Sequence, residues 1–378
     1  AGHWSNETSC LGPFEIADCN NNGVPDVCDV FWLEQDPPVP NPDPFEVMGC
    51  SLPPGFCDPY PPPSELDCNR NFVPDSCDVA YGAPDCNLDQ IPDECEAIVK
   101  WAAGSGNWAV ADNWNGMFVP TPSNFVCIGP DRGDLTIRVP PGAQAVGNYA
   151  CHENLSVTGG SLTTVWDSFV FGNLLLSGNG ILAHDQTLSV YGLFTWRQNA
   201  MLNSATPTQA TTLARGGAVI GPGSMTLGAR HIFDLAAGDA LATGLVNLQS
   251  QAVVRVQAGT KYEYQGNGNV FFGTLGSFQN EGIFLRSSGS GTATVWTPIN
   301  NDGLIHNQTA ELVLTAGGTY SGDLLGDPGT TIDFRSGTHT LHPGSSLSAD
   351  NVTCSGGTRQ NPRRGKNTGP PPDRAGTI

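Results

Sequence analysis

The segment Phe278-Gln-Asn-Glu-Gly282 returns 21 residues later as Ile299-Asn-Asn-Asp-Gly303, and this repeat decides the expected fold. Both segments place an apolar residue, an asparagine and a glycine at the same spacing. A second pair, Gly159-Gly-Ser-Leu162 and Gly178-Asn-Gly-Ile181, recurs after 19 residues. A period near 20 residues corresponds to one turn of a parallel β-helix, in which successive turns stack on one another.

Short β-prone runs separated by Gly, Asn and Asp fill the chain from residue 126 to about 354. Such punctuation is typical of strands joined by tight turns, and no long helical pattern interrupts it, which excludes βαβ folds. We expect roughly 11 turns, stacked about 4.8 Å apart. A β-sandwich is the main alternative, because the repeats are degenerate. The clearest runs are Leu135–Val139, Asn173–Ser177, Thr187–Tyr191, Val253–Val256, Val270–Phe272 and Glu311–Thr315.

The composition excludes several classes of protein. The 378 residues include 47 Gly and 30 Pro, the two poorest helix formers, so the chain is not mainly helical. The formal net charge of −20 argues against binding a nucleic-acid backbone, which needs Lys and Arg to replace counterions. No run of about 18 apolar residues occurs, so the sequence predicts no membrane span.

Three acidic segments of twelve residues align without gaps, at residues 18–29, 67–78 and 85–96. Each has oxygen-bearing side chains at positions 1, 3, 5, 9 and 12. Calcium takes six to eight oxygen ligands, and a tight loop delivers alternate side chains to one centre together with the backbone carbonyl of position 7. The pattern therefore predicts calcium-binding loops, resembling those of EF-hands, rather than a generic acidic surface. We expect about three Ca²⁺ ions, one in each loop.

The predicted metal ligands follow one scheme in all three loops. In the first loop they are Asp18, Asn20, Asn22, Val24, Asp26 and Asp29; in the second, Asp67, Asn69, Asn71, Val73, Asp75 and Asp78; in the third, Asp85, Asn87, Asp89, Ile91, Asp93 and Glu96. The side-chain charge is −3, −3 and −4, so we expect the third loop to bind most tightly. Only the first loop has glycine at position 6, where the loop turns sharply; Phe72 and Gln90 stand there in the others.

Twelve cysteines, nine of them before residue 96, indicate a disulfide framework and an extracellular location. Zinc is the competing interpretation, and it is disfavoured because no Cys-x-x-Cys pair occurs there. Cysteines stand at positions 2 and 11 of each loop, and two schemes stay open. Bridges could form within a loop (Cys19–Cys28, Cys68–Cys77, Cys86–Cys95) or between successive loops (such as Cys77–Cys86). The disulfide candidates are Cys10, Cys19, Cys28, Cys50, Cys57, Cys68, Cys77, Cys86, Cys95, Cys127 and Cys151.

The loop spacing resembles thrombospondin type 3 repeats and dockerin loops, over about 36 residues. Only six residues separate Asp78 from Asp85, which leaves no room for the paired helices of a dockerin. The resemblance to thrombospondin repeats implies a calcium-stiffened, disulfide-stapled stalk. The later β runs resemble the right-handed β-helices of pectin lyases and autotransporter passengers. The segment that contains Trp101, Trp108 and Trp114 resembles the opening of β-helices in secreted, bacterial adhesin-like proteins.

Together these patterns predict an all-β protein. Its right-handed parallel β-helix, a solenoid, follows a disulfide-rich, calcium-binding arm with little regular structure. The expected boundaries are 1–100 for the Cys- and Pro-rich arm, 101–128 for a Trp-rich cap, 126–354 for the β-helix and 355–378 for a basic tail. The arm carries 19 acids and two bases, whereas the tail carries five bases and one acid. Opposite charges at the two ends favour contact between chains.

The sequence favours a structural role. Solenoid ends that must be capped or used for association, together with an odd number of N-terminal cysteines, predict a homo-oligomer or polymer: a filament, tube or surface lattice. The alternative is a secreted adhesin or carbohydrate-binding stalk, with Trp108 and Trp114 stacking on glycans instead of capping the solenoid. A polysaccharide lyase that uses Lys261 as its base is less favoured. We find no catalytic constellation, and therefore expect no enzyme activity.

Overall fold

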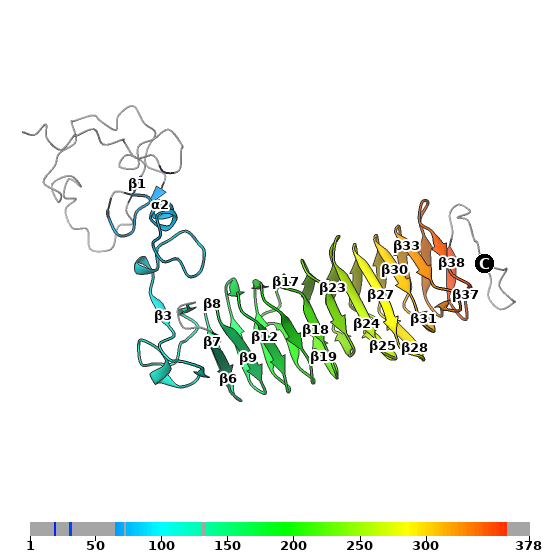
Figure 1. Ribbon diagram of the computed structural model, residues 1–378, viewed down its shortest axis with the longest axis horizontal. Helices are drawn as coiled ribbons and strands as arrows, with labels where there is room; N and C mark the ends of the chain where they lie inside the picture. The colour runs from blue at the N-terminus through cyan, green and yellow to red at the C-terminus, as the bar shows by residue number, and fades with distance from the viewer. Residues whose placement is uncertain (1–18, 20–29, 32–64, 72, 130–133, 361–378) are drawn as a thin grey trace, which may run out of the picture. The chain divides into compact units, whose positions relative to one another are not determined.

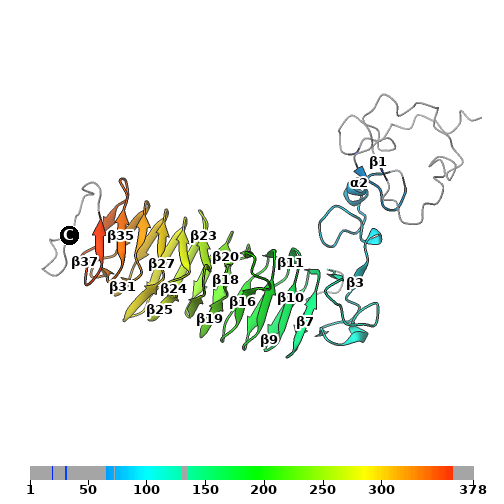
Figure 2. The same cartoon turned by 180° about the vertical axis from the view of Figure 1, so that it is seen from behind.

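The computed structural model describes residue 19 and residues 30–31, 65–71, 73–129 and 134–360. It divides into two units, Ala1–Ile98 and Val99–Ile378. In the first unit, the short strands β1 (Val30–Phe31) and β2 (Glu65–Leu66) pair in parallel. The helix α2 (Asp75–Ala80) and the 3₁₀ helix η1 (Asp93–Cys95) follow. The second unit is a parallel β-solenoid, visible as a row of stacked turns in Figure 1 and from behind in Figure 2. The expected all-β fold is confirmed.

Three parallel sheets form the walls of the solenoid, and from β5 onward each strand pairs with the strand three places further along the chain. The first sheet contains β7 (Ala143–Val146), β10 (Ser161–Thr164), β13 (Ile181–His184), β16 (Met201–Ser204), β19 (Ser224–Leu227), β22 (Leu245–Leu248), β25 (Gly268–Phe272), β28 (Thr292–Trp296), β31 (Glu311–Leu314), β34 (Thr331–Phe334) and β37 (Asn351–Thr353).

The second sheet contains β3 (Ile98–Lys100), β5 (Phe125–Ile128), β8 (Asn148–Cys151), β11 (Ser168–Val170), β14 (Thr187–Val190), β17 (Ala210–Ala214), β20 (His231–Leu235), β23 (Val253–Val256), β26 (Ser277–Asn280), β29 (Ile299–Asn301), β32 (Gly318–Tyr320), β35 (Thr338–Leu341) and β38 (Thr358–Gln360). The third contains β4 (Gly106–Asn107), β6 (Thr136–Val139), β9 (Asn154–Thr158), β12 (Leu174–Ser177), β15 (Phe194–Trp196), β18 (Ala218–Ile220), β21 (Ala240–Ala242), β24 (Lys261–Gln265), β27 (Ile283–Ser288), β30 (Leu304–Asn307), β33 (Asp323–Gly326) and β36 (Leu347–Ser348). Strand pairing thus continues past residue 354, because β38 pairs with β35.

The repeat that predicted the fold is one strand pair of the solenoid. Phe278 pairs with Ile299, and Asn280 pairs with Asn301, the register expected from the sequence. Both asparagines are buried, and Asn280 Nδ2 donates to Asn301 Oδ1 at 2.6 Å and to the carbonyl of Leu304 at 3.0 Å. The asparagine stack pairs the side-chain N–H groups of Asn280 and Asn301 with acceptors inside the core, whereas Asn280 Oδ1 has no partner.

The second repeat is shifted by one residue from its expected register. The structure pairs Ser161 with Ile181 and Leu162 with Leu182, a spacing of one residue more than the sequence suggested. The turn before β13 contains Gly178 and Asn179, both with left-handed backbone angles (φ 58° and 63°), and it absorbs the extra residue. A shift of one residue exchanges the two faces of a strand. Leu182, with 1% of its surface exposed, therefore fills the core, whereas Ile181 is 37% exposed.

The three tryptophans of the expected cap lie inside the first turn. Trp108 and Trp114 have 0% and 1% of their surface exposed, and their ring centroids are 4.9 Å apart. Trp101 packs edge-on against Trp114 at 4.8 Å, and Tyr149 packs against Trp108 at 6.3 Å. The alternative that Trp108 and Trp114 stack on carbohydrate is wrong, because both rings belong to the hydrophobic core, in line with the expected cap. They cover the start of the solenoid interior instead.

Two buried histidines occupy a corner between the first and second sheets. His184 Nε2 and His231 Nε2 each lie 2.9 Å from Thr212 Oγ1, and their rings are 4.7 Å apart. Burial lowers the pKa of His184 to about 4. Burial lowers the pKa of His231 as well, and the neighbouring His184 adds to that shift. Both side chains are therefore neutral in the folded protein at neutral pH.

Replacement of Leu182 by aspartate should unfold the solenoid locally, because it places an unpaired carboxylate in the core; the cost is several kcal/mol. Ile181→Asp is the matched control, since its side chain points outward and the change should cost about 0.5 kcal/mol or less. Thermal unfolding followed by circular dichroism measures both. If the two variants melted together, the one-residue shift in register would be refuted.

Acid should destabilise the solenoid through its buried histidines, of which His184 and His231 share this corner and His339, whose pKa burial also lowers, is a third. Their pKa values in the folded protein lie below 6.5, the ordinary value for an unfolded chain. The unfolded chain therefore binds more protons as pH falls below about 6.5, and stability decreases from there toward pH 4. His184 alone should account for roughly 3 kcal/mol of this loss.

Urea unfolding at pH 7.5, 6 and 5 measures the effect. The variant His184→Gln should show a smaller loss of stability with falling pH than the parent protein. His342→Gln, at an exposed position, should leave the pH dependence unchanged. Identical pH dependence in all three proteins would exclude the buried histidines as its source.

Candidate metal centre

The two described loops, 67–78 and 85–96, fold by the same set of side-chain to backbone hydrogen bonds. The carboxylate at position 1 and the amide at position 3 both accept from the N–H of position 5, and the side chain at position 5 accepts from the N–H of position 7. The acceptors are Asp67, Asn69 and Asn71 in the second loop (3.2, 3.1 and 2.8 Å) and Asp85, Asn87 and Asp89 in the third (3.3, 3.3 and 2.9 Å). The bonds bend each loop around its own side-chain oxygens.

Position 9 is an aspartate that begins a short helix in each loop. Asp75 begins α2 and Asp93 begins η1, each directly after a proline. Asp75 Oδ1 accepts from the backbone N–H of Cys68 at 2.9 Å, and Asp93 Oδ1 accepts from that of Cys86 at 2.7 Å. Both aspartates are buried. This bond closes each loop by joining position 9 to position 2.

The carboxylate at position 12 presents both of its oxygens to one point in each loop. Asn71 Nδ2 lies 2.9 Å from both Oδ1 and Oδ2 of Asp78. Asn87 Nδ2 lies 3.2 Å from both Oε1 and Oε2 of Glu96. A bidentate carboxylate at position 12 is the arrangement by which twelve-residue loops hold Ca²⁺. In each loop the NH₂ group of this asparagine, which is the positive end of the amide dipole, lies at equal distances from the two carboxylate oxygens.

The carboxylates crowd one another in both loops. Burial raises the pKa of Asp75, and the charges of Asp67, Asp78 and Asp89 raise it further. Burial, followed by the charge of Asp89, raises the pKa of Glu96 to about 7. In addition, the buried Oδ2 of Asp75 has no hydrogen-bond partner. A buried carboxylate oxygen without a partner is costly, and a cation would satisfy it. The donor set is entirely oxygen, so these residues fit Ca²⁺.

The loops tolerate residues other than glycine where the backbone is left-handed. Gln90, at position 6 of the third loop, has φ 72°, and Arg70 and Leu88, at position 4, have φ 60° and 62°. The left-handed region is accessible to such residues at a modest cost. The absence of glycine at position 6 of the third loop therefore does not prevent its turn.

Several predicted residues lie outside the described part of the chain. They comprise all ligands of the first loop and four cysteines: Asp18, Asn20, Asn22, Val24, Asp26, Asp29, Cys10, Cys28, Cys50 and Cys57. Phe72 also lies outside it. The carbonyl groups of Val73 and Ile91 belong to described residues of the second and third loops.

Two disulfides join different loops. Cys19 is bridged to Cys77 and Cys68 to Cys95, with Cα–Cα distances of 5.9 and 5.7 Å, within the usual range. Each bridge joins position 2 of one loop to position 11 of the next. The bridges Cys19–Cys28, Cys68–Cys77, Cys86–Cys95 and Cys77–Cys86 therefore do not form. Cys86 is also disulfide-bonded, and so is Cys127.

Asp75 lies close to the sulfurs of Cys68 and Cys95, but these three residues are not a metal site. The two sulfurs belong to one disulfide, and the metal-binding form of cysteine is the thiolate. Metal binding in this unit is therefore expected from the oxygen atoms of the loops. The same bridge argues against zinc ligation by Cys68 and Cys95.

The prediction that Cys151 forms a disulfide is wrong. Its side chain is completely buried in the solenoid, and its register partners on the adjacent turns are Ile128 and Val170. Its thiol donates to the carbonyl of Glu153 at 3.2 Å. Burial raises the pKa of the thiol to about 12, so Cys151 packs as a small apolar residue.

Lys261 is held in an ion cluster on the solenoid surface. Its Nζ lies 2.9 Å from Glu263 Oε2 and 3.5 Å from Asp239 Oδ2. The hydrogen bond to Glu263 raises the pKa of the Lys261 amine above its ordinary value of 10.5. A general base must be unprotonated at working pH. The structure therefore gives no support to Lys261 as the base of a lyase.

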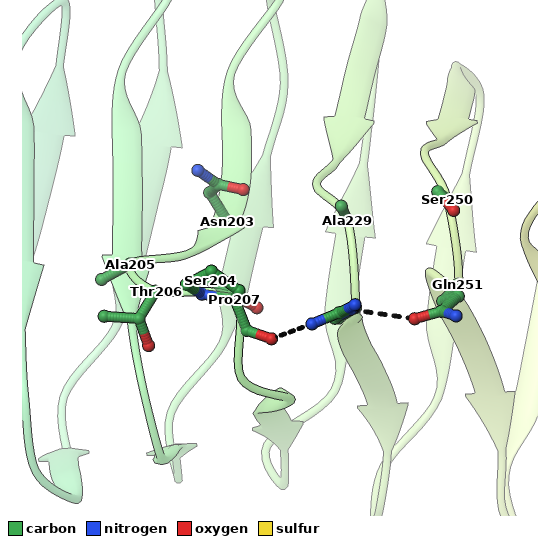
Figure 3. Close-up of a pocket in the computed structure, with 9 residues that line it drawn as sticks. Asn203, Ser204, Ala205, Thr206, Pro207, Ala229, Ser250 and Gln251 are labelled. Atoms are coloured by element: carbon green, nitrogen blue, oxygen red, sulfur yellow. Dashed lines mark hydrogen bonds between the residues drawn. The ribbon is translucent and has the colours of Figure 1, made fainter.

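A polar depression of about 470 Å³ lies beside the turns that follow β16, β19 and β22. Pro207 and Gln251 are among the lining residues labelled in Figure 3. The Arg230 side chain donates to the Pro207 carbonyl and, at 2.9 Å, to Gln251 Oε1. Its lining residues include neither an acid nor a histidine. The depression offers polar contacts without a group that would transfer protons.

Comparison with known proteins found no family model, no curated protein and no solved structure that matches the chain. Within the part of the chain that the structure describes, no helix has the length and apolar content needed to cross a membrane. Support for metal binding thus comes from the loops themselves: in each, both oxygens of the carboxylate at position 12 face one asparagine amide, and in the second loop Asp75 has a buried oxygen without a partner.

Peptide mapping under non-reducing conditions should recover Cys19 linked to Cys77 and Cys68 linked to Cys95. The expected result follows from the Cα–Cα distances, which suit these pairs. The same digest after reduction is the control, since both linked species should then disappear. Recovery of Cys68 linked to Cys77 would contradict the structure.

Proposed function

We propose that this chain is an extracellular structural protein. Its β-solenoid serves as a self-assembling rod, and calcium together with disulfides orders its N-terminal arm. The disulfides support an oxidising compartment, as in secreted proteins. The parallel stack supports a rod, because each turn contacts only its neighbours and length grows with turn number.

The role of calcium is supported by the crowding of carboxylates in the second and third loops. Without a counter-charge these groups repel one another, and this repulsion adds to burial, the larger cause, in raising the pKa values of Asp75 and Glu96. Ca²⁺ bound by these oxygens would neutralise the repulsion and hold each loop closed. This is the stiffening role implied by the resemblance to thrombospondin type 3 repeats.

The observation that carries the self-assembly proposal is the one-sided pairing of the last described strands. Among residues 134–360, β36, β37 and β38 each pair with a strand on one side only. Unpaired parallel edges are templates for further strands, and a second copy of the chain offers strands of the same geometry. The opposite charges of residues 1–100 and 355–378 favour an end-to-end arrangement.

The two alternatives receive less support from the described residues. The adhesin hypothesis relied on Trp108 and Trp114, whose rings are buried. The lyase hypothesis relied on Lys261, whose amine is held protonated by Glu263. Neither alternative explains why three acidic loops precede the solenoid.

Removal of calcium should loosen the arm before the solenoid. After EDTA treatment, protease should cleave within residues 65–96 while residues 134–360 stay intact, because backbone hydrogen bonds hold the solenoid independently of calcium. Limited proteolysis with mass spectrometry measures this, and Ca²⁺ added back should restore resistance. Equal cleavage with and without EDTA would exclude calcium as the stabiliser.

Electron microscopy of the native protein tests assembly separately. We expect filaments, tubes or a lattice in calcium, and their shortening or loss in EDTA. Dispersed monomers under both conditions, at concentrations where the protein is folded, would overturn the assembly proposal and leave the calcium result untouched.

A further inference from the structure

A carboxylate from the third loop reaches the ligand cluster of the second. Asn69 Nδ2 donates to Asp78 Oδ2 at 2.9 Å and, with its other hydrogen, to Glu94 Oε1 at 2.8 Å. Asn69 and Asp78 are positions 3 and 12 of the second loop, whereas Glu94 is position 10 of the third. Two carboxylate oxygens from different loops therefore converge on one polar group.

The disulfide between the loops explains this placement. Cys68 precedes Asn69 and Cys95 follows Glu94, and the two cysteines are bridged with Cα atoms 5.7 Å apart. The covalent bond therefore sets the backbone of Glu94 beside position 3 of the second loop. Glu94 is also the middle residue of η1, whose first residue, Asp93, is fixed by its bond to Cys86. Both ends of this short segment are anchored.

We propose that Glu94 is a ligand of the ion held by the second loop, so that the third loop completes the second calcium site. The inference rests on the calcium binding proposed above. Independent support comes from Asp75 of the second loop, which is 2% exposed and has an Oδ2 atom without a partner. The Asp75 carboxylate interacts electrostatically with Asp67 and Asp78, so this buried oxygen belongs to the same loop's carboxylate cluster, where a cation would satisfy it. Rotation of the Asn69 amide would turn its oxygen toward the point where its NH₂ group now stands.

The added ligand changes the expected order of affinities. The second loop alone supplies Asp67, Asp75 and Asp78, a side-chain charge of −3; Glu94 raises the charge at its ion to −4, equal to that of the third loop. Affinity for Ca²⁺ rises with the number of charged ligands. The predicted advantage of the third loop over the second should therefore disappear.

The arrangement also couples the two sites, and the coupling is reciprocal. Ca²⁺ in the third loop would order η1 and so place Glu94 for the second ion, which lowers the entropy cost of the second binding event. Position 10 is valine in the first loop (Val27) and serine in the second (Ser76), neither of which carries a charge. Only the third loop can supply a carboxylate to its neighbour in this way.

Backbone amide NMR of the full chain, titrated with Ca²⁺ after EDTA treatment, tests the inference. The amides of Asn71 and Val73 report the second loop, and those of Asp89 and Ile91 report the third, since each donates to a loop oxygen. In Glu94→Gln, the Kd at the second loop should rise roughly tenfold, as expected for loss of a charged ligand, while the Kd at the third loop changes less than about twofold. The exposed Asp112→Asn is the charge-matched control and should leave both loops unchanged.

Each other outcome has a separate meaning. If the unmodified chain shows no Ca²⁺-dependent shifts, the calcium proposal itself fails. If it binds Ca²⁺ and Glu94→Gln binds with the same affinity at the second loop, the ligand role of Glu94 is refuted while calcium binding stands. An equal, small rise of the Kd at both loops would show that Glu94 acts only through its charge, which also overturns the inference.

Discussion

Parallel pairing between each strand and the strand three places later is the constraint on which the rest of the solenoid depends. It obliges the chain to return to the same wall after about 20 residues, so each side chain stacks on its counterpart in the next turn. Stacks of like residues follow from this. Asn280 bonds Asn301 inside the core, and the ring of Phe171 stacks on that of Tyr191 at 5.0 Å outside it. Buried side chains of the core therefore find many of their hydrogen-bond partners on the adjacent turn.

The sequence predicted the type of fold because its strongest signal is periodic. Turn residues mark every return of the chain, and the pair Phe278 and Ile299 lies in the expected register. The predicted register was wrong at Ile181. The turn before it holds one additional residue, with the backbone angles that glycine and asparagine allow. Turn length varies without altering the apolar character of the strands. A one-residue change there is therefore invisible in composition, although it decides which side chain is buried.

The candidate site divides in the same way into local and non-local parts. The ligand spacing of a twelve-residue loop is local, so Asp75 and Glu96 could be proposed as ligands from the sequence alone. The disulfide partners and Glu94 depend on how one loop packs against the next. No spacing rule distinguishes Cys77 from Cys95 as the partner of Cys68, and Glu94 stands at a position that does not ligate within its own loop. The sequence does carry one signal for Glu94: among the three aligned loops, only the third has a carboxylate at position 10.

The crossed order of the two bridges has a mechanical consequence. Tension applied at Cys19 passes through the first bridge to Cys77, back along the chain to Cys68, and through the second bridge to Cys95. Only the stretch between Cys68 and Cys77 can extend, about nine residues or roughly 30 Å at full stretch. An unbridged chain from Cys19 to Cys95 would lengthen to roughly 250 Å. The stretch that can extend is the second loop itself, so pulling on the arm would load the proposed calcium ligands first.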